Sequence, residues 1–502
     1  MEIVAILGLV ILMYWRTLKY NYMIDDNVRR WEYLYIVPEV SPPIGFYLSK
    51  PHPWRHLWLV ISHCVVVMLI NFMWGWKAAL IFAVHPVNVT CTAWITGGYY
   101  SSTAILAITA YMCVHLWNNW LGGLLGSMFF TAALGSTITC LGLPFIFLFS
   151  HHWGLMFWWP TLTYLLGKRF ITGFNIRNDG KQDPITIRKV AVMAKVVAYY
   201  IRLAIFPDKL AFFRKMGFDY NRKIAAKNYL DSFNKDFWKS LGVIVVFVAV
   251  GGYFSWFGVV WFLCTIAVFS QFKLLGQFIA ERYLYLPNVG IALILSNALG
   301  GHTSIFIVVA TLMAYRAHLY IPAWENMFKL YKDGIKNYPD CITNYCNLAE
   351  LYIQTGEYIR AHRLLEEALS LDNHSFLAHC NMAAYWVVVK AWDKALVHTR
   401  MGLRCQDFKP KNQNKEDGVT KILVKQEKDL VEEIGRIRKM VEEIQLHEDP
   451  ELVKKQKVEQ YNKVKADIEA MTKSAWNLEK ELGIGGVKDG LDVGSKTPVG
   501  VN

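Results

Sequence analysis

Apolar runs separated by short polar connectors occupy the chain from residue 3 to about residue 320. A helix needs ~20 apolar residues to cross a bilayer squarely, and many of these runs are shorter. We therefore expect a compact bundle of membrane helices, several of them tilted or incomplete. The predicted segments are Ile3–Trp15, Leu57–Trp74, Trp76–Thr96, Ser101–Trp117, Trp120–Leu134, Ile138–Ser150, Leu155–Leu166, Val190–Phe206, Leu241–Phe272, Val289–Leu299 and Ser304–Tyr315.

Two of these runs contain a predicted break. His85-Pro86 interrupts Trp76–Thr96, because proline lacks a backbone donor and clashes with the preceding helical turn. Gly251-Gly252 divides Leu241–Phe272 into two predicted spans. The basic loop 167–189 is a cytoplasmic candidate by the positive-inside rule, although the same charges could bind an anionic headgroup on the other side.

The hydrophobic period changes after residue 320. The pattern of small and aromatic residues in 345–368 recurs in 379–399, and Ala349 and Ala383 are 34 positions apart (383 − 349 = 34). That is the period of the tetratricopeptide repeat, which is a pair of helices. We expect Ala323–Tyr338 to be the second helix of an earlier, partial repeat. So short an array more often serves as a docking or capping module than as a peptide-binding groove.

Charged helices are predicted beyond the repeats. Val419–Leu446 and Leu452–Leu482 carry apolar residues at alternating steps of three and four, which indicates a helical hairpin or a self-association surface. The Gly-rich end is expected to be disordered. The predicted fold is therefore mainly α, with a membrane domain at 1–320, repeats at 321–408, a charged hairpin at 409–482 and a tail at 483–502.

Composition supports a multi-pass membrane protein. The chain has 502 residues, of which 54% are hydrophobic and 19% charged, and its mean hydropathy is +0.24. The net charge of +13 fits basic loops that face the cytoplasm or anionic lipid. Nucleic-acid binding is disfavoured because Lys and Arg are dispersed. Phosphate-loop, dinucleotide-binding, nucleophile-elbow and zinc motifs are absent, as are a cleavable signal peptide and a disulfide pattern.

Two acidic motifs are candidates for chemistry. Asp25 and Asp26 follow the first apolar run, where a carboxylate can take a proton from an attacking hydroxyl; the alternative is a solvated turn. Glu281-Arg282 lies between apolar runs, and a charge at membrane depth costs about 2.5–3.5 kcal/mol on insertion scales. Arg282 could fork onto a phosphate while the neighbouring acid holds it. The alternative is a structural ion pair near the interface.

Other polar residues in apolar segments have structural alternatives. His85 stands at a helix break and His63 lies inside the second apolar run, where capping or core roles are common. Arg202 shares a segment with Lys195 and could line a basic pocket or extend to the headgroups. The sequon Asn88-Val89-Thr90 lies in an apolar segment, which argues against its glycosylation.

Taken together, these motifs resemble the transmembrane and tetratricopeptide-repeat-containing protein family, which are O-mannosyltransferases of the GT-C class. The resemblance covers roughly residues 1–405, and its most specific part is Ala280–Pro287, Ala-Glu-Arg-Tyr-Leu-Tyr-Leu-Pro. The other matching motifs, in chain order, are Asn21–Asp26, Trp54-Arg55-His56-Leu57 with His63, Phe82–Val87, and Arg202-Leu203 with Phe206-Pro207.

The resemblance implies a GT-C fold with its active site on the non-cytoplasmic face. The donor would be a polyprenyl-phosphate hexose, mannose above all, with no nucleotide cofactor, and the acceptor a protein or glycan selected by the repeats. The resemblance does not decide whether a divalent cation bridges Asp25 or Asp26 to the donor phosphate. The implied membrane is the bacterial inner membrane, or the endoplasmic reticulum in a eukaryote. The base would be Asp25 or Asp26. The donor phosphate would be held by Arg282 and Arg202, with Glu281 and Tyr285. The pocket would be lined by His85, His63 and Arg55.

One departure bears on activity. Members of the family usually carry a Lys-Glu pair before the helix that here begins near Ile138, whereas this chain has Gly135-Ser136-Thr137. Either another basic residue substitutes, or the substrate has changed, or activity is lost. The alternatives to an enzyme are a non-catalytic membrane scaffold with recruiting repeats and, less favoured for lack of an internal membrane repeat, a transporter.

Overall fold

The computed structural model describes residues 1–23, 53–147, 152–171, 187–214, 233–270 and 279–406, with isolated helical positions between 428 and 439. These residues are mainly helical and contain no β-strand, which confirms the predicted mainly α class. The chain divides into two compact units, Met1–Val424 and Lys425–Asn502. The predicted hairpin and tail lie outside the described residues, apart from those isolated positions.

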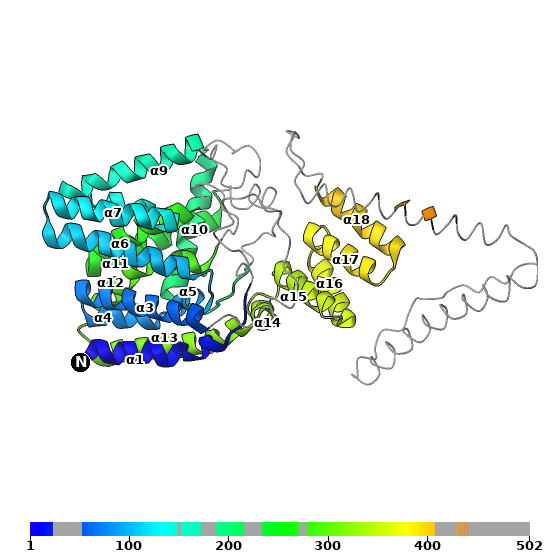
Figure 1. The fold of residues 1–502 in the computed structure, drawn as a ribbon, viewed down its shortest axis with the longest axis horizontal. Helices are drawn as coiled ribbons and strands as arrows, with labels where there is room; N and C mark the ends of the chain where they lie inside the picture. Colours follow the sequence, from blue (N-terminus) through cyan, green and yellow to red (C-terminus); the bar gives the residue numbers. More distant parts are fainter. Residues whose placement is uncertain are drawn as a thin grey trace, which may run out of the picture. The chain divides into compact units, whose positions relative to one another are not determined.

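The first unit contains a bundle of helices with roughly parallel axes, followed by shorter helix pairs (Figure 1). The bundle consists of α1 (Glu2–Tyr14), α3 (Pro53–Trp74), α4 (Trp76–Val84), α5 (Val89–Ala93), α6 (Gly98–Trp117), α7 (Trp120–Ser136), α8 (Leu143–Phe147), α9 (Trp158–Ile171), α10 (Ile187–Ile205), α11 (Lys235–Ile266), α12 (Asn288–Leu299) and α13 (Thr303–Tyr320). Short 3₁₀ turns join several of them, among them η1 (Trp15–Lys19), η3 (Pro86–Asn88), η4 (Ile138–Gly142), η8 (Glu281–Leu284) and η9 (Ile321–Glu325).

Local sequence explains where several helices end. The predicted break at His85-Pro86 is confirmed, because α4 ends at Val84 and η3 begins at Pro86. Asn118 and Asn119 make the tight turn between α6 and α7. Asn118 adopts the left-handed φ of 39°, and the Asn119 side chain accepts a hydrogen bond of 2.8 Å from the first turn of α7.

The segment predicted as two spans around Gly251-Gly252 folds back three residues after that pair. Ser255 in α11 has an extended backbone, with φ −158° and ψ 92°. The rings of Phe247 and Phe262 consequently lie side by side with centroids 5.2 Å apart, which a straight helix cannot achieve across 15 residues. The second half of α11 then packs on α12, where Gly258 and Gly290 let the two backbones touch.

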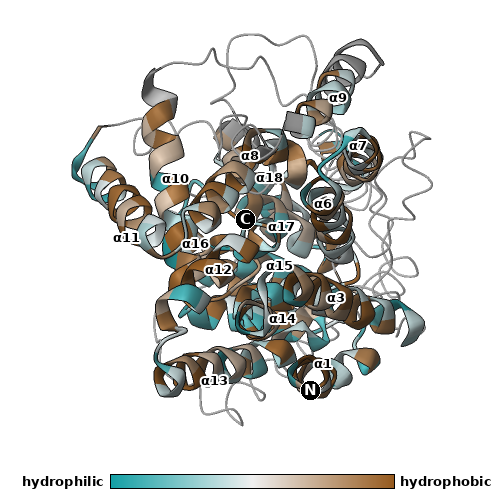
Figure 2. Ribbon diagram, turned by 90° about the vertical axis from the view of Figure 1, so that its left-hand side faces the viewer, coloured by the Kyte–Doolittle hydropathy of each residue, from teal (hydrophilic) through white to brown (hydrophobic). Residues whose placement is uncertain are grey.

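Within the described ranges, three helical stretches are long and apolar enough to cross a membrane, namely Pro53–Trp74, Lys235–Phe269 and Thr303–Glu325. The second of them contains the fold-back at Ser255. Hydrophobic residues predominate along these helices and α1 (Figure 2). Large apolar side chains such as Phe72 and Leu312 are 65% and 60% exposed. An outward apolar surface of this kind suits contact with lipid.

The helices after the bundle form pairs with a fixed spacing. They are α14 (Met327–Asn337), α15 (Ile342–Gln354), α16 (Tyr358–Leu371), α17 (Phe376–Val388) and α18 (Trp392–Gln406). The starts of α15 and α17 are 34 residues apart (376 − 342 = 34), as are those of α16 and α18 (392 − 358 = 34). Gly356 and Lys390, also 34 apart, both have positive φ, at 81° and 62°. The helix predicted over 323–338 is confirmed for Met327–Asn337 but starts later than expected, because the extended residue Asn326 separates η9 from α14 and its side chain caps α14.

Candidate functional site

The Ala280–Pro287 segment lies between α11 and α12 and forms the one-turn helix η8. Ala280 is extended, and its backbone N–H donates to the Tyr200 hydroxyl at 3.3 Å. Pro287 then directly precedes α12, a position at which its fixed φ suits the start of a helix. The tight turn places Glu281 and Arg282 on opposite sides of the segment.

Glu281 is 3% exposed and accepts hydrogen bonds on both carboxylate oxygens. Its Oε2 receives the hydroxyls of Thr90 and Tyr320, each at 2.9 Å. Its Oε1 receives the backbone N–H of Ala211 at 2.8 Å and an ion pair from Arg214. These five residues, the Glu281 cluster, join α5, the loop after α10, η8 and α13. Such saturation is what a buried carboxylate requires.

The expected pairing of Glu281 with its neighbour Arg282 was wrong. The carboxylate pairs with Arg214 instead, whose side chain is 1% exposed. The physical reason is that successive residues of a helical turn do not face one another. Arg282 therefore keeps its charge on the other side of η8.

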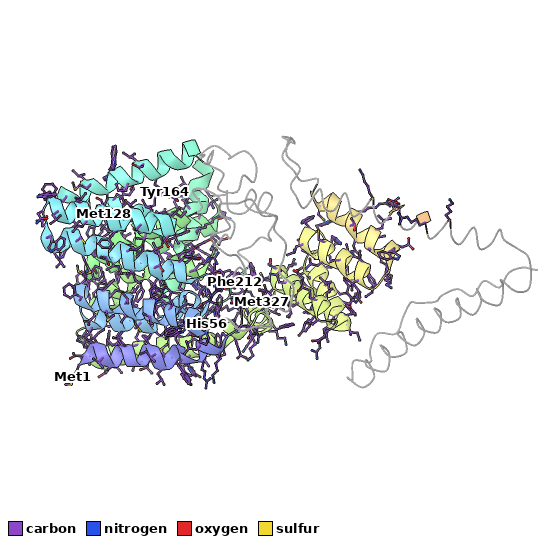
Figure 3. The ribbon with its side chains drawn as sticks, viewed as in Figure 1. Met1, His56, Met128, Tyr164, Phe212 and Met327 are labelled. Atoms are coloured by element: carbon purple, nitrogen blue, oxygen red, sulfur yellow. The ribbon has the colours of Figure 1, made fainter. Side chains whose placement is uncertain are left out.

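Arg282 is half-buried among aromatic rings. Its Cζ atom lies 5.5 Å from the ring centres of both Trp94 and Phe212, and 4.9 Å from that of Tyr283. The ring of Trp324 stacks on Trp94 with centroids 6.1 Å apart. The positive charge of the guanidinium is attracted to the faces of these rings. Figure 3 labels Phe212 and His56 at one end of the bundle and Met128 at the other, so Arg282 lies near a helix-bundle end.

This region has more buried hydrogen-bond donors than acceptors. Arg214 leaves Nε and Nη1 without a partner among the described residues. The indole Nε1 atoms of Trp94 and Trp324, both nearly fully buried, are likewise unpaired in this part of the chain. A buried donor without an acceptor costs about 1–3 kcal/mol. A ligand that brings oxygen acceptors would relieve that cost.

The two histidines of the predicted pocket are fully hydrogen-bonded. His63 Nε2 lies 3.2 Å from the carbonyl of Ala83 and must carry the proton, so its Nδ1 accepts from the Tyr285 hydroxyl at 2.6 Å. His85 Nε2 donates to the carbonyl of Ala204 at 2.8 Å, and its Nδ1 accepts from a backbone N–H in η3. Both imidazoles therefore join helices, which is the structural alternative raised for them.

The other predicted residues are placed as follows. Arg202 is exposed and forms an ion pair of 2.8 Å with Asp208 rather than with the Glu281 cluster. Arg55 is exposed at the start of α3, with its Cζ 5.6 Å from the ring of Tyr22. Asp25 and Asp26 lie outside the described residues.

Two sequence expectations concern hydroxyl groups. Where the family resemblance leads one to expect a Lys-Glu pair, the hydroxyls of Thr103, Thr137 and Thr139 form a chain with distances of 3.0 and 2.8 Å. That position is therefore neutral and internally satisfied. The sequon is buried, with Asn88 donating to a backbone carbonyl at 2.7 Å and Thr90 bound to Glu281, which agrees with the expected lack of glycosylation.

Sequence reasoning missed Arg214, Trp94 and Trp324. Arg214 lies in a segment with mixed charge, where a buried arginine has no distinguishing pattern. Trp94 is one of 19 tryptophans, so its type alone is uninformative. The one available clue was Glu281 itself, because a buried carboxylate requires a cation from elsewhere in the chain.

Searches against family models, curated proteins and solved structures found no match to this chain. Within the described ranges, no group of three or more His, Cys, Asp or Glu side chains is arranged to hold a metal ion. The site is therefore defined by its own geometry, as a cluster of buried donors at one end of an apolar helix bundle.

Proposed function

We propose that this chain is a membrane glycosyltransferase of GT-C type that transfers a hexose, mannose above all, from a polyprenyl-phosphate donor to a protein or glycan acceptor. The observation that carries the proposal is the excess of buried donors around η8. Arg214 pairs with Glu281 but leaves Nε and Nη1 without a partner among the described residues, and Arg282 lies on the other side of η8 against Trp94. Unpaired indole N–H groups lie beside them.

A phosphate fits this environment chemically. It supplies several acceptor oxygens and negative charge, and guanidinium groups bind it in a forked geometry. A polyprenyl chain would keep that phosphate at the surface of the bilayer, where the end of a membrane helix bundle lies. Because the Glu281 oxygens are already occupied, this carboxylate serves to position Arg214 and does not act as an acid or base.

The reaction requires one bond to form and one to break. An acceptor hydroxyl oxygen attacks the anomeric carbon as the bond from that carbon to the phosphate oxygen breaks, and the phosphate leaves with the electron pair. Asp25 or Asp26 takes the hydroxyl proton. Arg282 stabilises the charge that develops on the leaving phosphate. Attack opposite the leaving group inverts the anomeric centre.

The helix pairs after the bundle support a tetratricopeptide assignment for 342–406. Their starts repeat at 34 residues, and a left-handed residue recurs in each turn between paired helices. Asn381 in α17 donates to a backbone carbonyl of α15 at 2.9 Å, which ties one pair to the next. In this proposal the repeats present or select the acceptor.

A specific observation favours a second function, that of a non-catalytic membrane scaffold. The neutral threonine chain at Thr103, Thr137 and Thr139 replaces a charged pair expected of an active enzyme. In that case the repeats recruit a partner and the donor-rich cluster binds an anionic lipid without turnover.

The deciding experiment is sugar transfer by purified protein in lipid nanodiscs. The donor is a radiolabelled polyprenyl-phosphate mannose, and the acceptors are a panel of peptides and glycans. Wild type should release polyprenyl phosphate, and either Asp25→Asn or Asp26→Asn should abolish transfer. Asp236→Asn is the matched control, because that aspartate pairs with Lys239 at the exposed start of α11.

Donor binding is measured separately with polyprenyl phosphate and polyprenol. Losing a charged hydrogen bond costs about 1.5–3 kcal/mol, so Arg282→Gln should weaken phosphate-lipid binding on the order of ten- to a hundred-fold. Arg360→Gln, an exposed change on α16, should have no effect. Binding without transfer would select the scaffold, and equal binding of polyprenol would refute the phosphate site.

A further inference from the structure

Two histidine rings meet between neighbouring helices of the repeat region, far along the chain from η8. His379 of α17 and His398 of α18 approach through their Nδ1 atoms, which are 3.1 Å apart. The ring centroids are 5.4 Å apart at an angle of 36°. His379 is 5% exposed, whereas His398 is half-buried and open to solvent on one side.

The contacts of His379 fix its tautomer. Its Nε2 lies 2.8 Å from the backbone carbonyl of Asn373, which can only accept, so Nε2 carries the hydrogen. The lone pair of Nδ1 is therefore directed at His398. A backbone carbonyl behind one ring nitrogen is the usual support of a metal-binding histidine, since it orients the ring and increases the basicity of the other nitrogen.

The separation of the two nitrogens matches a shared ion. Imidazole nitrogens bind Zn²⁺ at ~2.0–2.1 Å, so two of them at an angle of ~100° lie about 3.1 Å apart. The centroid separation of 5.4 Å places the two Nδ1 atoms in line between the rings, so each ring must turn by about 40° before both lone pairs meet at one ion. We propose that His379 and His398 together bind a transition-metal ion such as Cu²⁺, Ni²⁺ or Zn²⁺ through Nδ1, with water as the remaining ligands.

Among the described residues, no third side chain joins the two histidines as a ligand. His362 on α16 directs its Nδ1 towards Glu366 at 3.6 Å, and Lys394 on α18 lies over the ring of Trp386 at 4.3 Å. No larger ligand group occurs in the described part of the chain. Binding should therefore be weaker than in four-ligand structural zinc sites, and should follow the order Cu²⁺ over Ni²⁺, with Mg²⁺ and Ca²⁺ excluded.

The test uses the full-length, untagged protein in detergent and measures Ni²⁺ binding by equilibrium dialysis and calorimetry. His398→Gln should remove one equivalent of bound Ni²⁺, or weaken its binding at least tenfold. Any rise in Tm that Ni²⁺ causes in wild type should be lost in this variant. His374→Gln is the control, because that histidine is exposed on the loop before α17. His398 is the better target for substitution than the more buried His379.

A spectroscopic measurement separates the two rings from other histidines. With one equivalent of Cu²⁺, electron paramagnetic resonance should show coupling to two imidazole nitrogens in wild type and in His374→Gln, but not in His398→Gln. Equal metal stoichiometry and equal spectra in wild type and His398→Gln would overturn the proposal and leave the pair as a hydrogen bond between helices.

Discussion

The buried ion pair of Glu281 and Arg214 gives the sharpest test of the site's architecture. Both side chains are 2% exposed or less. Removing one partner of a buried pair leaves an uncompensated charge, which costs about 3–5 kcal/mol. Glu281→Gln should therefore destabilise the protein by about that amount. Arg214→Met should cost less, because Thr90, Tyr320 and Ala211 still donate to the remaining carboxylate.

The double variant Glu281→Gln with Arg214→Met measures the coupling energy between the two side chains. Once Arg214 is replaced by Met, Glu281→Gln no longer strands a cation, so the two changes together should cost less than their sum. Residues in one hydrogen-bonded network show coupling energies of about 0.5–3 kcal/mol, and burial places this pair in the upper half of that range. Unfolding in detergent, followed by tryptophan fluorescence, measures all four proteins.

A matched cycle provides the control. Arg360 on α16 and Glu357, which directly precedes that helix, form an exposed pair, with side chains 67% and 43% exposed. Exposed pairs contribute about 0.2–1 kcal/mol, so the equivalent substitutions there should be nearly additive. If the effects of Glu281→Gln and Arg214→Met on the free energy of unfolding are as additive as those of the exposed pair, the buried ion pair does not stabilise η8 in the way proposed.

Three further predictions concern the packing of the fold. Lys390 has a left-handed φ that costs an L-residue about 1–2 kcal/mol, so Lys390→Gly should raise the Tm, whereas Gly356→Ala, at the corresponding turn, should lower it. Gly290→Ala should disrupt the packing of α11 on α12, because its Cβ would overlap backbone atoms of α11; Gly301→Ala, with open space around it, should be tolerated in the same thermal assay. Burial and neighbouring histidines lower the pKa of His398 from 6.5 to about 4, so the unfolded chain binds this proton more readily. The free energy of unfolding should therefore fall as the pH decreases from 6.5 to 4. His398→Gln should reduce that loss in unfolding curves recorded with a chelator. If the variant shows the same pH dependence as wild type, the lowered pKa of His398 is not its cause.

The sequence anticipated the helices well, because their determinants are local. The break at His85-Pro86 follows from the chemistry of proline, and the 34-residue spacing follows from small residues that recur at helix contacts. Local patterns failed where chain reversal depends on packing. The reversal in α11 is at Ser255 rather than at the glycine pair, and Gly251 instead packs against Val259 across the fold-back.

The amino-acid sequence by itself determined that the chain is helical and apolar enough for a membrane, and it singled out Glu281 and Arg282 as ionisable groups between apolar runs. Only the tertiary structure decided their partners. Glu281 binds Arg214, 67 positions away, and Arg282 faces Trp94 and Phe212 from two other segments. A buried charge selects whichever opposite charge the fold brings within reach, and that distance in space is not encoded in local periodicity.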